Sequence, residues 1–286
     1  MTLQLENDAL ETAPTQPPLA PTVDHAYLER LQATLTSAED AVASGLEVGA
    51  QRSTGEQKKN ELAVSVVIPV YNERDTIAEI VRRVQAVEVH SEIVIVDDYS
   101  RDGTREVLFE LSKQPDIRVI MHGYNQGKGA ALRTGFAEVE GDVVIIQDAD
   151  LEYDPQDYKK LLEPIQRGET DVVFGSRFLE NANQDPSLLH RFGNWALTSL
   201  SNRLTGQRLT DMETCYKVFR RSAIQAIHFQ QDRFGFEPEI TAKLSHLGKK
   251  IVEVPISYEY RSYEQGKKIG LRDGLNAIWC ILKYAF

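Results

Sequence analysis

Two aspartates, Asp148 and Asp150, stand directly after the apolar run DVVIIQ (Asp142–Gln147), in the segment QDADLEYDP. In extended chain, side chains two residues apart point to the same side, so both carboxylates should face one space. Like charges at that spacing need a cation between them or a raised pKa. A hard divalent ion held by one or two carboxylates and by substrate phosphates meets that need. A solvated acidic turn is the alternative, and the position at the end of a strand favours the metal site.

Polar side chains also follow two earlier apolar runs, in the segments VDDYSRDGT and PVYNERD. Asp98 could accept hydrogen bonds from a base or a ribose, whereas Asp102 is of the type that caps a following helix. In the other segment, Tyr71 could stack on a ligand or bond to it, and Asp75 could cap the next helix. We therefore interpret Asp98 and Tyr71 as ligand contacts and the other two as caps.

Several common site signatures are missing from the chain. No GxGxxG follows the first apolar run, which argues against a dinucleotide fold. GYNQGK (Gly123–Lys128) is one residue too short for a P-loop, and Gly129 replaces its Ser or Thr, so we reject that interpretation. The six histidines show no HxxxH or HExxH spacing. Cys215 and Cys280 are too few for a disulfide framework or a zinc cluster, and we expect two reduced structural thiols.

The elements that must position these residues alternate along the chain. Short β-branched runs predict strands, given in order as Val64–Val70, Glu92–Asp98, Ile117–Met121, Asp142–Gln147, Thr170–Ser176, Tyr216–Phe219 and Ile251–Tyr260. Helical spacing predicts helices over Thr76–Val87, Thr104–Ser112, Gly127–Val139, Pro155–Ile165, Leu189–Leu204, Ile240–Leu247 and Gly270–Tyr284. This alternation predicts an open, mostly parallel α/β sheet with helices on both faces. Ligands of such sheets bind beyond the carboxyl ends of the strands, where the acidic segments lie.

Composition sets the outer bounds. The chain has 286 residues, 42% of them hydrophobic, and a net charge of −11. An acidic protein of this kind is not expected to bind nucleic acid, because phosphate binding needs a basic face. No apolar run approaches the roughly 18 residues of a membrane-spanning helix, and the acidic N-terminus shows no secretory signal. A cytoplasmic protein is expected, with peripheral binding at the cytoplasmic face of the membrane as an option.

The first 60 residues differ from the rest. Thr15–Thr22 is rich in Pro, Thr and Ala, and Gly49–Asn60 is a polar linker. Between them, His25–Leu46 has leucines at helical spacing. We expect a mobile N-terminal arm over residues 1–60, with room for one short helix, and a single domain over residues 61–286.

Taken together and in order, six segments resemble family 2 glycosyltransferases of the GT-A fold. They are IPVYNE, VDDYSRDGT, NQGKGAALRTGF, DADLEYDP, GSRF and VPISYEYRSYEQGKKIG. The similarity is greatest to the dolichyl-phosphate mannose synthase branch and its bacterial polyprenyl-phosphate relatives, and it covers Val64–Phe286. The resemblance implies a nucleotide-binding half and an acceptor half, a nucleotide-sugar donor, Mg²⁺ or Mn²⁺, and inversion at the anomeric carbon.

The resemblance also assigns residues. It implies donor contacts at Pro69, Tyr71, Glu73, Val96, Asp98, Asp148, Ala149, Asp150, Arg177, Arg261 and Lys267. It implies metal ligands at Asp148, Asp150 and Glu152, with Asp150 the principal one; many relatives have Gln in place of Glu152. Catalytic roles fall to Asp150, Arg177 and Arg191, the two arginines lying near the donor and acceptor phosphates. A guanidinium fork matches phosphate oxygens, although a solvated surface position is the usual alternative for an arginine.

Three functions remain to be weighed. The first is transfer of a hexose from a GDP-mannose or UDP-glucose type donor to polyprenyl phosphate, an anionic acceptor that needs cations but no general base. The second keeps the fold but uses a soluble or cell-envelope hydroxyl acceptor, with Glu237 as the base; we favour a structural role for Glu237. The third is a non-catalytic nucleotide-sugar-binding subunit, which retention of Asp148 and Asp150 disfavours.

A lipid acceptor requires contact with the membrane. Residues 249–286 hold seven basic and four acidic side chains, a local excess of positive charge in an acidic chain. The last predicted helix has apolar residues at helical spacing, and such a helix could lie in a membrane interface. The same stripe could simply cover the sheet. The expected partner is therefore the membrane surface or a membrane-anchored protein.

Overall fold

Residues 62–179, 188–260 and 271–285 are described in the computed structural model of the protein. They belong to one unit of the chain, Asn60–Phe286. The arm expected over residues 1–60, and the expected donor contacts Arg261 and Lys267, lie outside the described residues and stay predictions.

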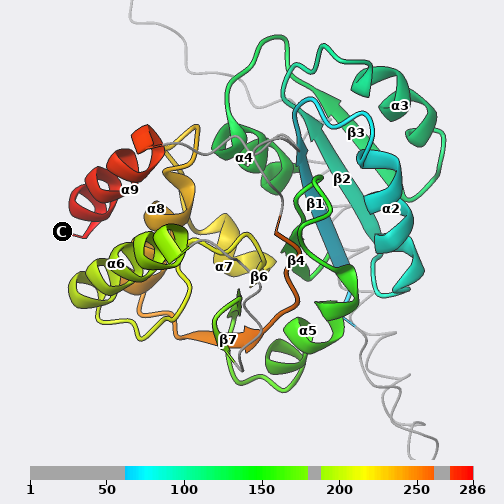
Figure 1. Ribbon diagram of the computed structural model, residues 1–286. Helices are drawn as coiled ribbons and strands as arrows, with labels where there is room; N and C mark the ends of the chain where they lie inside the picture. The colour runs from blue at the N-terminus through cyan, green and yellow to red at the C-terminus, as the bar shows by residue number, and fades with distance from the viewer. Residues whose placement is uncertain (1–61, 180–187, 261–270, 286) are drawn as a thin grey trace, which may run out of the picture. The chain divides into compact units, whose positions relative to one another are not determined.

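The described residues contain a seven-stranded sheet in the order β3-β2-β1-β4-β6-β5-β7 (Figure 1). Its strands are β1 (Val64–Val70), β2 (Glu92–Asp97), β3 (Ile117–Met121), β4 (Val143–Ile146), β5 (Val172–Ser176), β6 (Lys217–Arg220) and β7 (Ile251–Pro255). Every neighbouring pair is parallel except the two that β6 makes, with β4 and with β5. The predicted open, mostly parallel sheet is confirmed.

Helices cover both faces of this sheet. They are α2 (Ile77–Ala86), α3 (Thr104–Leu111), α4 (Lys128–Glu138), the 3₁₀ turn η1 (Pro155–Asp157), α5 (Tyr158–Gln166), α6 (Leu188–Thr205), α7 (Arg221–Gln225), α8 (Phe236–His246) and α9 (Leu271–Tyr284). The short α7 has no counterpart among the predicted helices, and α8 begins four residues earlier than predicted. Pro238 lies in the first turn of α8, where a missing N–H breaks no helical bond.

The alternation of side chains along the strands produces two cores. Val66 and Ile68 of β1 point to one face and pack with α2, α3 and α5. Val67 of β1, together with Val94 and Val96 of β2, points to the other face and packs with α4, α7 and α8. Both faces of each central strand are therefore apolar, as period-two geometry requires for a strand buried on both sides.

Strand β6 runs against its neighbours, and this decides what meets at the edge of the sheet. Its register with β4 pairs Ile145 with Val218, so the first residue of β6, Lys217, lies at the carboxyl end of β4. The loop before β6 therefore lies at the same edge of the sheet as the carboxyl ends of the parallel strands. Asp148 and Asp211, which are far apart in the chain, thus reach the same edge of the sheet.

Among the described residues, no helix has both the length and the apolar character needed to cross a bilayer.

Candidate functional site

The acidic loop after β4 starts from a rigid anchor. Gln147 is fully buried, and its Oε1 accepts hydrogen bonds from the hydroxyls of Tyr158 and Tyr216, both at 2.7 Å. Its Nε2 donates to the carbonyl oxygen of Asp148 at 3.0 Å. The two aspartates therefore leave the sheet from a fixed point, while Leu151 takes a left-handed φ of 66° to turn the chain.

Asp150 has a raised pKa. Burial, followed by the nearby carboxylates of Asp148 and Glu152, raises the pKa of Asp150 to about 7. A hydrogen bond from the Glu152 N–H to Oδ1, at 3.1 Å, opposes that rise. A carboxylate in this environment gains from a bound cation, so the donor set fits a divalent ion.

In the part of the chain that the structure describes, no three Asp, Glu, His or Cys side chains are grouped so that they alone could hold a metal ion. A two-carboxylate site suits an ion that completes its ligands with substrate phosphates and water.

Glu152, the third predicted metal contact, is tied to the segment after β7. The hydroxyl of Tyr258 donates to Glu152 Oε2 at 2.7 Å, and the N–H of Glu259 donates to the Glu152 carbonyl at 2.8 Å. Tyr153 and Tyr258 form an isolated antiparallel bridge beside these bonds. The acidic loop is thus clipped to the stretch of chain that ends at Tyr260, the last described residue before the gap.

Lys128 lies at the centre of the site, although sequence reasoning gave it no role. Its Nζ is 3.1 Å from Asp148 Oδ1 and 3.4 Å from Glu237 Oε1, and it also contacts the Cys215 thiol. Burial by itself would lower the pKa of Lys128, but Asp148, Cys215 and Glu237 raise it well above its ordinary value. The ammonium is therefore a permanent positive charge beside the predicted metal ligands. The signal for it was a lysine in a glycine-rich turn that opens a helix.

Two glycines let this lysine enter the site. Gly127 has a φ of 106°, and a Cβ on Gly129 would lie 2.2 Å from the carbonyl oxygen of Gln231. The start of α4 is bound to the same segment, because the N–H of Ala130 donates to the carbonyl of Asp232 at 3.1 Å. Backbone approach this close leaves no room for a side chain.

We expect Gly129→Ala to lower the free energy of unfolding by about 2 kcal/mol or more, because the backbone at residues 231–233 must move to admit the methyl group. Urea denaturation measures the change. Gly123→Ala is the matched control, since a Cβ at Gly123 meets nothing within 4 Å. Equal stability of the two variants would contradict the close approach.

Arg177, a predicted phosphate ligand, is held by an acidic partner. Its Nε and Nη2 donate to the two carboxylate oxygens of Asp211 at 2.7 and 2.8 Å, and its backbone N–H donates to the same group at 3.1 Å. The guanidinium also lies 5.1 Å from the centre of the Tyr258 ring. Burial opposes the charge of Arg177, but Asp211 raises the pKa well above its usual value. Arg177 is thus a fixed cation whose fork is engaged by Asp211.

Asp211 is itself positioned by β7. Its backbone N–H donates to Glu253 Oε1 at 2.9 Å, and the neighbouring Thr210 N–H donates to Glu253 Oε2 at 2.7 Å. Asp211 is fully buried. In the loop before β6, Asp211 is therefore held by Glu253 through its backbone and by Arg177 through its side chain. The spacing of the sequence motifs did not predict this arrangement.

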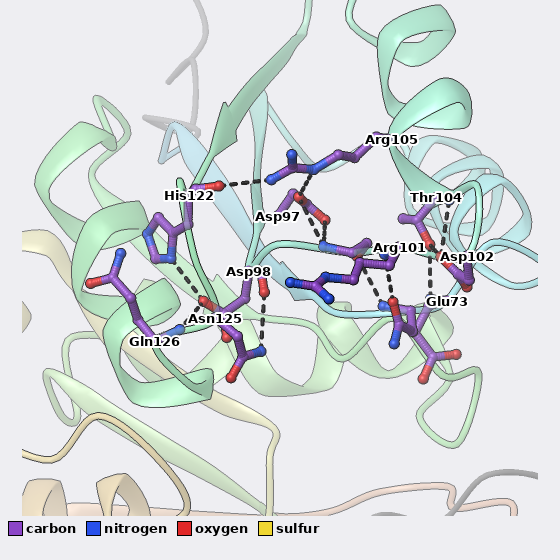
Figure 2. Close-up of polar contacts among 12 residues, drawn as sticks. Glu73, Asp97, Asp98, Arg101, Asp102, Thr104, Arg105, His122, Asn125 and Gln126 are labelled. Atoms are coloured by element: carbon purple, nitrogen blue, oxygen red, sulfur yellow. Dashed lines mark hydrogen bonds and ion pairs between the residues drawn. The ribbon is translucent and has the colours of Figure 1, made fainter.

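The carboxyl end of β2 shows how Asp98 is used (Figure 2). Its Oδ1 accepts from the Gln126 N–H at 2.8 Å and lies 2.9 Å from His122 Nδ1, while Oδ2 accepts from the Gly127 N–H at 2.7 Å. Asp98 thus anchors the turn that leads into α4. The structure thus gives Asp98 an anchoring role that the sequence did not predict. Its contact with a donor stays a prediction.

The two residues of β2 that precede Asp98 point to opposite faces of the sheet. Asp97 is fully buried and pairs with Arg105 at 2.6 Å, and Arg105 also donates to the His122 carbonyl at 2.7 Å. The side chain of Val96 is buried in the apolar core beneath α4. Any contact between Val96 and a donor would therefore have to use its backbone.

The loop after β1 is bonded to the loop after β2 (Figure 2). The N–H of Glu73 donates to Thr104 Oγ1 at 3.0 Å, and the N–H of Arg101 donates to Asn72 Oδ1 at 2.9 Å. Asn72 has a φ of 53°, which turns the chain sharply after Tyr71. The predicted donor contacts Pro69, at the end of β1, and Tyr71, exposed just beyond it, therefore lie beside the Asp98 turn.

Neither of the two predicted caps occupies the N-cap position of its helix. Gly103 is the N-cap of α3, and Asp102, one residue earlier, accepts through Oδ1 from the N–H of Thr104, the first residue of α3, at 3.1 Å. The prediction for Asp75 is wrong, because Thr76 occupies the N-cap position of α2 and Asp75 pairs with Arg74 at 2.9 Å. The helix begins at Ile77, one residue later than the sequence suggested.

The remaining predicted residues are more scattered. Ala149 is buried between the two aspartates of the loop. Arg191 is exposed in the first turns of α6 and makes no ion pair among the described residues. Glu237 is buried at the start of α8 and pairs with Lys128, while Glu239 accepts from the N–H groups of Gln230 and Gln231.

Comparison with known proteins fits this geometry. The family model described as Glycosyl transferase family 2 matches residues 65–227, more than half of the chain. The chain belongs to glycosyl transferase family 2. The resemblance inferred from the six segments is confirmed, and so is an enzyme of the glycosyltransferase class.

Two curated relatives of this family 2 glycosyltransferase act on lipid phosphates by name. The undecaprenyl-phosphate 4-deoxy-4-formamido-L-arabinose transferase of Edwardsiella ictaluri is 32% identical over 222 residues, which cover 76% of this chain and 66% of the relative. The dolichol-phosphate mannosyltransferase of Pyrococcus furiosus is 30% identical over 230 residues, which cover 78% of this chain and 64% of the relative. The match thus spans slightly less than two thirds of these relatives.

The solved structures confirm the GT-A fold. Glucosyl-3-phosphoglycerate synthase from Mycobacterium tuberculosis in complex with UDP has a TM-score of 0.64 at 19% identity, covering 82% of this chain and 86% of that one. Its complex with Mn²⁺ and UDP-glucose has a TM-score of 0.62 at 19% identity, covering 82% and 85%. At this identity the likeness establishes the architecture alone.

Proposed function

We propose that this family 2 glycosyltransferase moves a hexose from a nucleotide-sugar donor to polyprenyl phosphate, with inversion and with a divalent metal. The observation that carries the proposal is the meeting of Asp148, Asp150 and Lys128 at the carboxyl edge of the sheet. Such a group of charges suits a diphosphate with its counter-ion. The names of the two curated relatives support the lipid phosphate acceptor.

The metal would be held by Asp148 and Asp150, with Glu152 as a further contact, and Mg²⁺ or Mn²⁺ suits these oxygen ligands. When bound, it neutralises the charge that develops on the nucleoside diphosphate leaving group. Lys128 adds a second, permanent positive charge to the same space. Because Gln147 and the glycine turn fix these groups, little reorganisation is needed during the reaction.

The donor and the acceptor phosphate fall to different residues in this proposal. Nucleotide contacts come from Pro69, Tyr71, Glu73, Val96 and Asp98 at the ends of β1 and β2, with Ala149 beside the metal ligands and Arg177, Arg261 and Lys267 near the phosphates. Arg177 and Arg191 hold the acceptor phosphate, which is anionic at neutral pH and attacks without a general base. The role of the chain is to bring two anions together in line, and cations make that possible.

A hydroxyl acceptor is the second candidate. It would need a base, and Glu237 was the candidate for it. In the structure Glu237 is buried and paired with Lys128, an arrangement that favours its structural role. Dependence of turnover on Glu237 but not on Arg191 would favour the hydroxyl acceptor.

The experiment that tests the proposal incubates purified protein and Mg²⁺ or Mn²⁺ with GDP-mannose, UDP-glucose or UDP-N-acetylglucosamine, each with a polyprenyl phosphate. Mass spectrometry identifies the products, and Asp150→Ala is the control. We expect a glycosyl-phospho-lipid from one donor, absent in the variant. Metal-dependent donor hydrolysis without lipid product would reject the lipid acceptor. Nucleotide binding without transfer or hydrolysis would instead favour the non-catalytic subunit.

Metal affinity should depend on pH through Asp150. Its carboxyl must lose a proton to bind the ion, and the pKa of Asp150 is raised to about 7 by burial, Asp148 and Glu152. Below that pH, we expect the affinity for Mn²⁺ to fall by about tenfold for each pH unit, and above about pH 8 to become constant. Calorimetric titration of the full chain with Mn²⁺ between about pH 6 and pH 8.5 measures this, and a flat profile would contradict it.

The proposed setting is the cytoplasmic face of a membrane, where the protein binds the surface or a membrane-anchored partner. Residues 1–60 are proposed as a mobile arm ahead of the catalytic domain, 61–286. Neither proposal assigns nucleic acid a role.

A further inference from the structure

Helices α6 and α9 present a large apolar surface to solvent. Six of their side chains are between 39% and 70% exposed, namely Phe192, Trp195, Leu275, Ile278, Trp279 and Leu282. Figure 1 shows the two helices side by side, and they pack against each other and against α8. We call this the α6–α9 surface. Large apolar side chains exposed as a group on two packed helices, unlike ones exposed singly, indicate an interaction site.

Helix α9 has apolar side chains on two opposite sides. Ala277, Cys280 and Ile281 already form the buried side of the helix, which packs on the core. Leu275, Trp279 and Leu282 repeat at helical spacing on the opposite side and are open to solvent. A helix that only covers a sheet needs one apolar face, so the second apolar face needs another partner.

The residue types point to a bilayer. The chain has two tryptophans, Trp195 and Trp279, and both lie exposed on this surface. The indole ring combines an apolar body with a polar N–H and is enriched at the boundary between lipid and water. Phe192 stacks beside Trp195 with ring centres 5.6 Å apart, which makes a broad aromatic contact.

Charge points the same way. The described side chains of α6 and α9 include three exposed basic residues, Arg191, Arg203 and Lys283, and no acidic residue. This excess stands out in a chain whose net charge is −11. Basic side chains flanking apolar ones are attracted to anionic headgroups, whereas an acidic protein surface elsewhere is repelled by them.

The surface is joined to the site. Thr198 of α6 accepts a hydrogen bond from the N–H of Met212 at 3.1 Å, next to the Asp211 that holds Arg177. On the other helix, Cys280 packs against Gly235, where α8 begins just before Glu237. A bilayer in contact with α6 and α9 would therefore lie against the elements that support Arg177 and Lys128.

We propose that the α6–α9 surface docks the protein on an anionic lipid bilayer, with Trp195 and Trp279 entering the interface. The inference rests on the proposed function, because a lipid acceptor is what the bilayer would supply. Docking brings the site to the depth of lipid headgroups, where a phosphate on a long isoprenoid chain is presented. In this proposal the side chains of α6 and α9 determine binding to the membrane, and the residues of the site determine which donor is used.

Intrinsic fluorescence tests this directly, because the only two tryptophans of the sequence report from the surface itself. The full chain is mixed with vesicles of phosphatidylcholine alone or of phosphatidylcholine with phosphatidylglycerol, and flotation measures binding. We expect binding and a blue-shifted emission with the anionic vesicles, both reduced by high salt. Failure to float with either vesicle would overturn the proposal.

Leu275→Gln/Leu282→Gln weakens the surface and keeps both tryptophans as reporters. We expect its vesicle partition coefficient to fall about tenfold or more, as the loss of two buried apolar side chains implies. Phe109→Gln is the matched control, since Phe109 is exposed to a similar degree on α3. Equal loss in both variants, or no loss in the double variant, would overturn the proposal.

Activity separates this inference from the proposed function. The double variant should keep its rate with a short-chain isoprenyl phosphate dissolved in buffer and lose rate with a long-chain acceptor in vesicles. Vesicle binding without transfer to either acceptor would reject the function and leave the docking surface intact. Sedimentation that shows a dimer, lost in the double variant, would assign the surface to a second copy and overturn bilayer docking.

Discussion

Asp150→Asn should lower the rate of sugar transfer by about a thousandfold or more. Asparagine keeps the size of the side chain but removes the negative charge that would bind the divalent ion, and charge neutralisation at a leaving group is worth several kcal/mol. The measurement is product formation at saturating donor and metal. Asp154→Asn is the matched control on the same loop, because Asp154 caps η1 by accepting from the Gln156 N–H.

The same substitution should make the metal-free protein more stable. The pKa of Asp150 is raised from 3.8 to about 7 in the folded state by burial, Asp148 and Glu152, so the folded protein holds this proton more tightly than the unfolded chain. The free energy of unfolding therefore falls as the pH rises from 3.8 to about 7, and the loss persists above that. Asparagine removes this loss.

Thermal unfolding at about pH 8 without metal should thus show a higher melting temperature for Asp150→Asn than for the unmodified protein. Added Mn²⁺ should stabilise the unmodified protein and leave the variant unchanged, since a ligand stabilises only a state that binds it. A variant that is inactive and also less stable at that pH would show that Asp150 is mainly structural.

Lys128→Met should have the largest effect on stability among the site residues. It leaves the carboxylates of Asp148 and Glu237 without their shared cation, and breaking such a buried pair costs about 3–5 kcal/mol. Transfer should fall as well, because Lys128 is the fixed positive charge beside the metal ligands. Urea denaturation and donor titration measure the two effects.

A double variant separates the causes. Lys128→Met/Glu237→Gln removes one of the stranded charges, so it should recover part of the stability but none of the transfer rate. Lys113→Met is the control, since Lys113 and its partner Glu110 are both exposed and such a pair is worth about 1 kcal/mol or less. No recovery in the double variant would contradict a charge-based explanation.

Local pattern predicted the sheet well because the strands carry their own signal. β1 and β3 have the predicted bounds, and the acidic loop follows β4 as expected. A short apolar run bounded by turn residues predicts a strand that is buried on both faces, and the residues of the run alone are enough for that prediction. The short helix α7, only five residues long, has too little periodicity to be detected.

The site was predicted only in part, because its charges are paired across long stretches of chain. Lys128 pairs with Glu237, which lies more than 100 residues later in the sequence, and Arg177 pairs with Asp211 in the loop before β6. No spacing rule connects such residues. Lys128 belongs to no P-loop, and only the fold brings it to Asp148, 20 residues away in the sequence.

The order of the strands has a consequence for how the chain folds as it is synthesised. β4 and β5 follow one another in sequence, but β6 lies between them and pairs with both. The parallel half, β1 to β4, can assemble as soon as residue 146 is available, whereas β5 must wait for residues 217–220. During that interval β5 is an unpaired apolar segment, exposed to wrong pairing. The arrival of β6 therefore ends the interval in which β5 has no partner, and the other edge of β5 is covered only when β7, residues 251–255, follows.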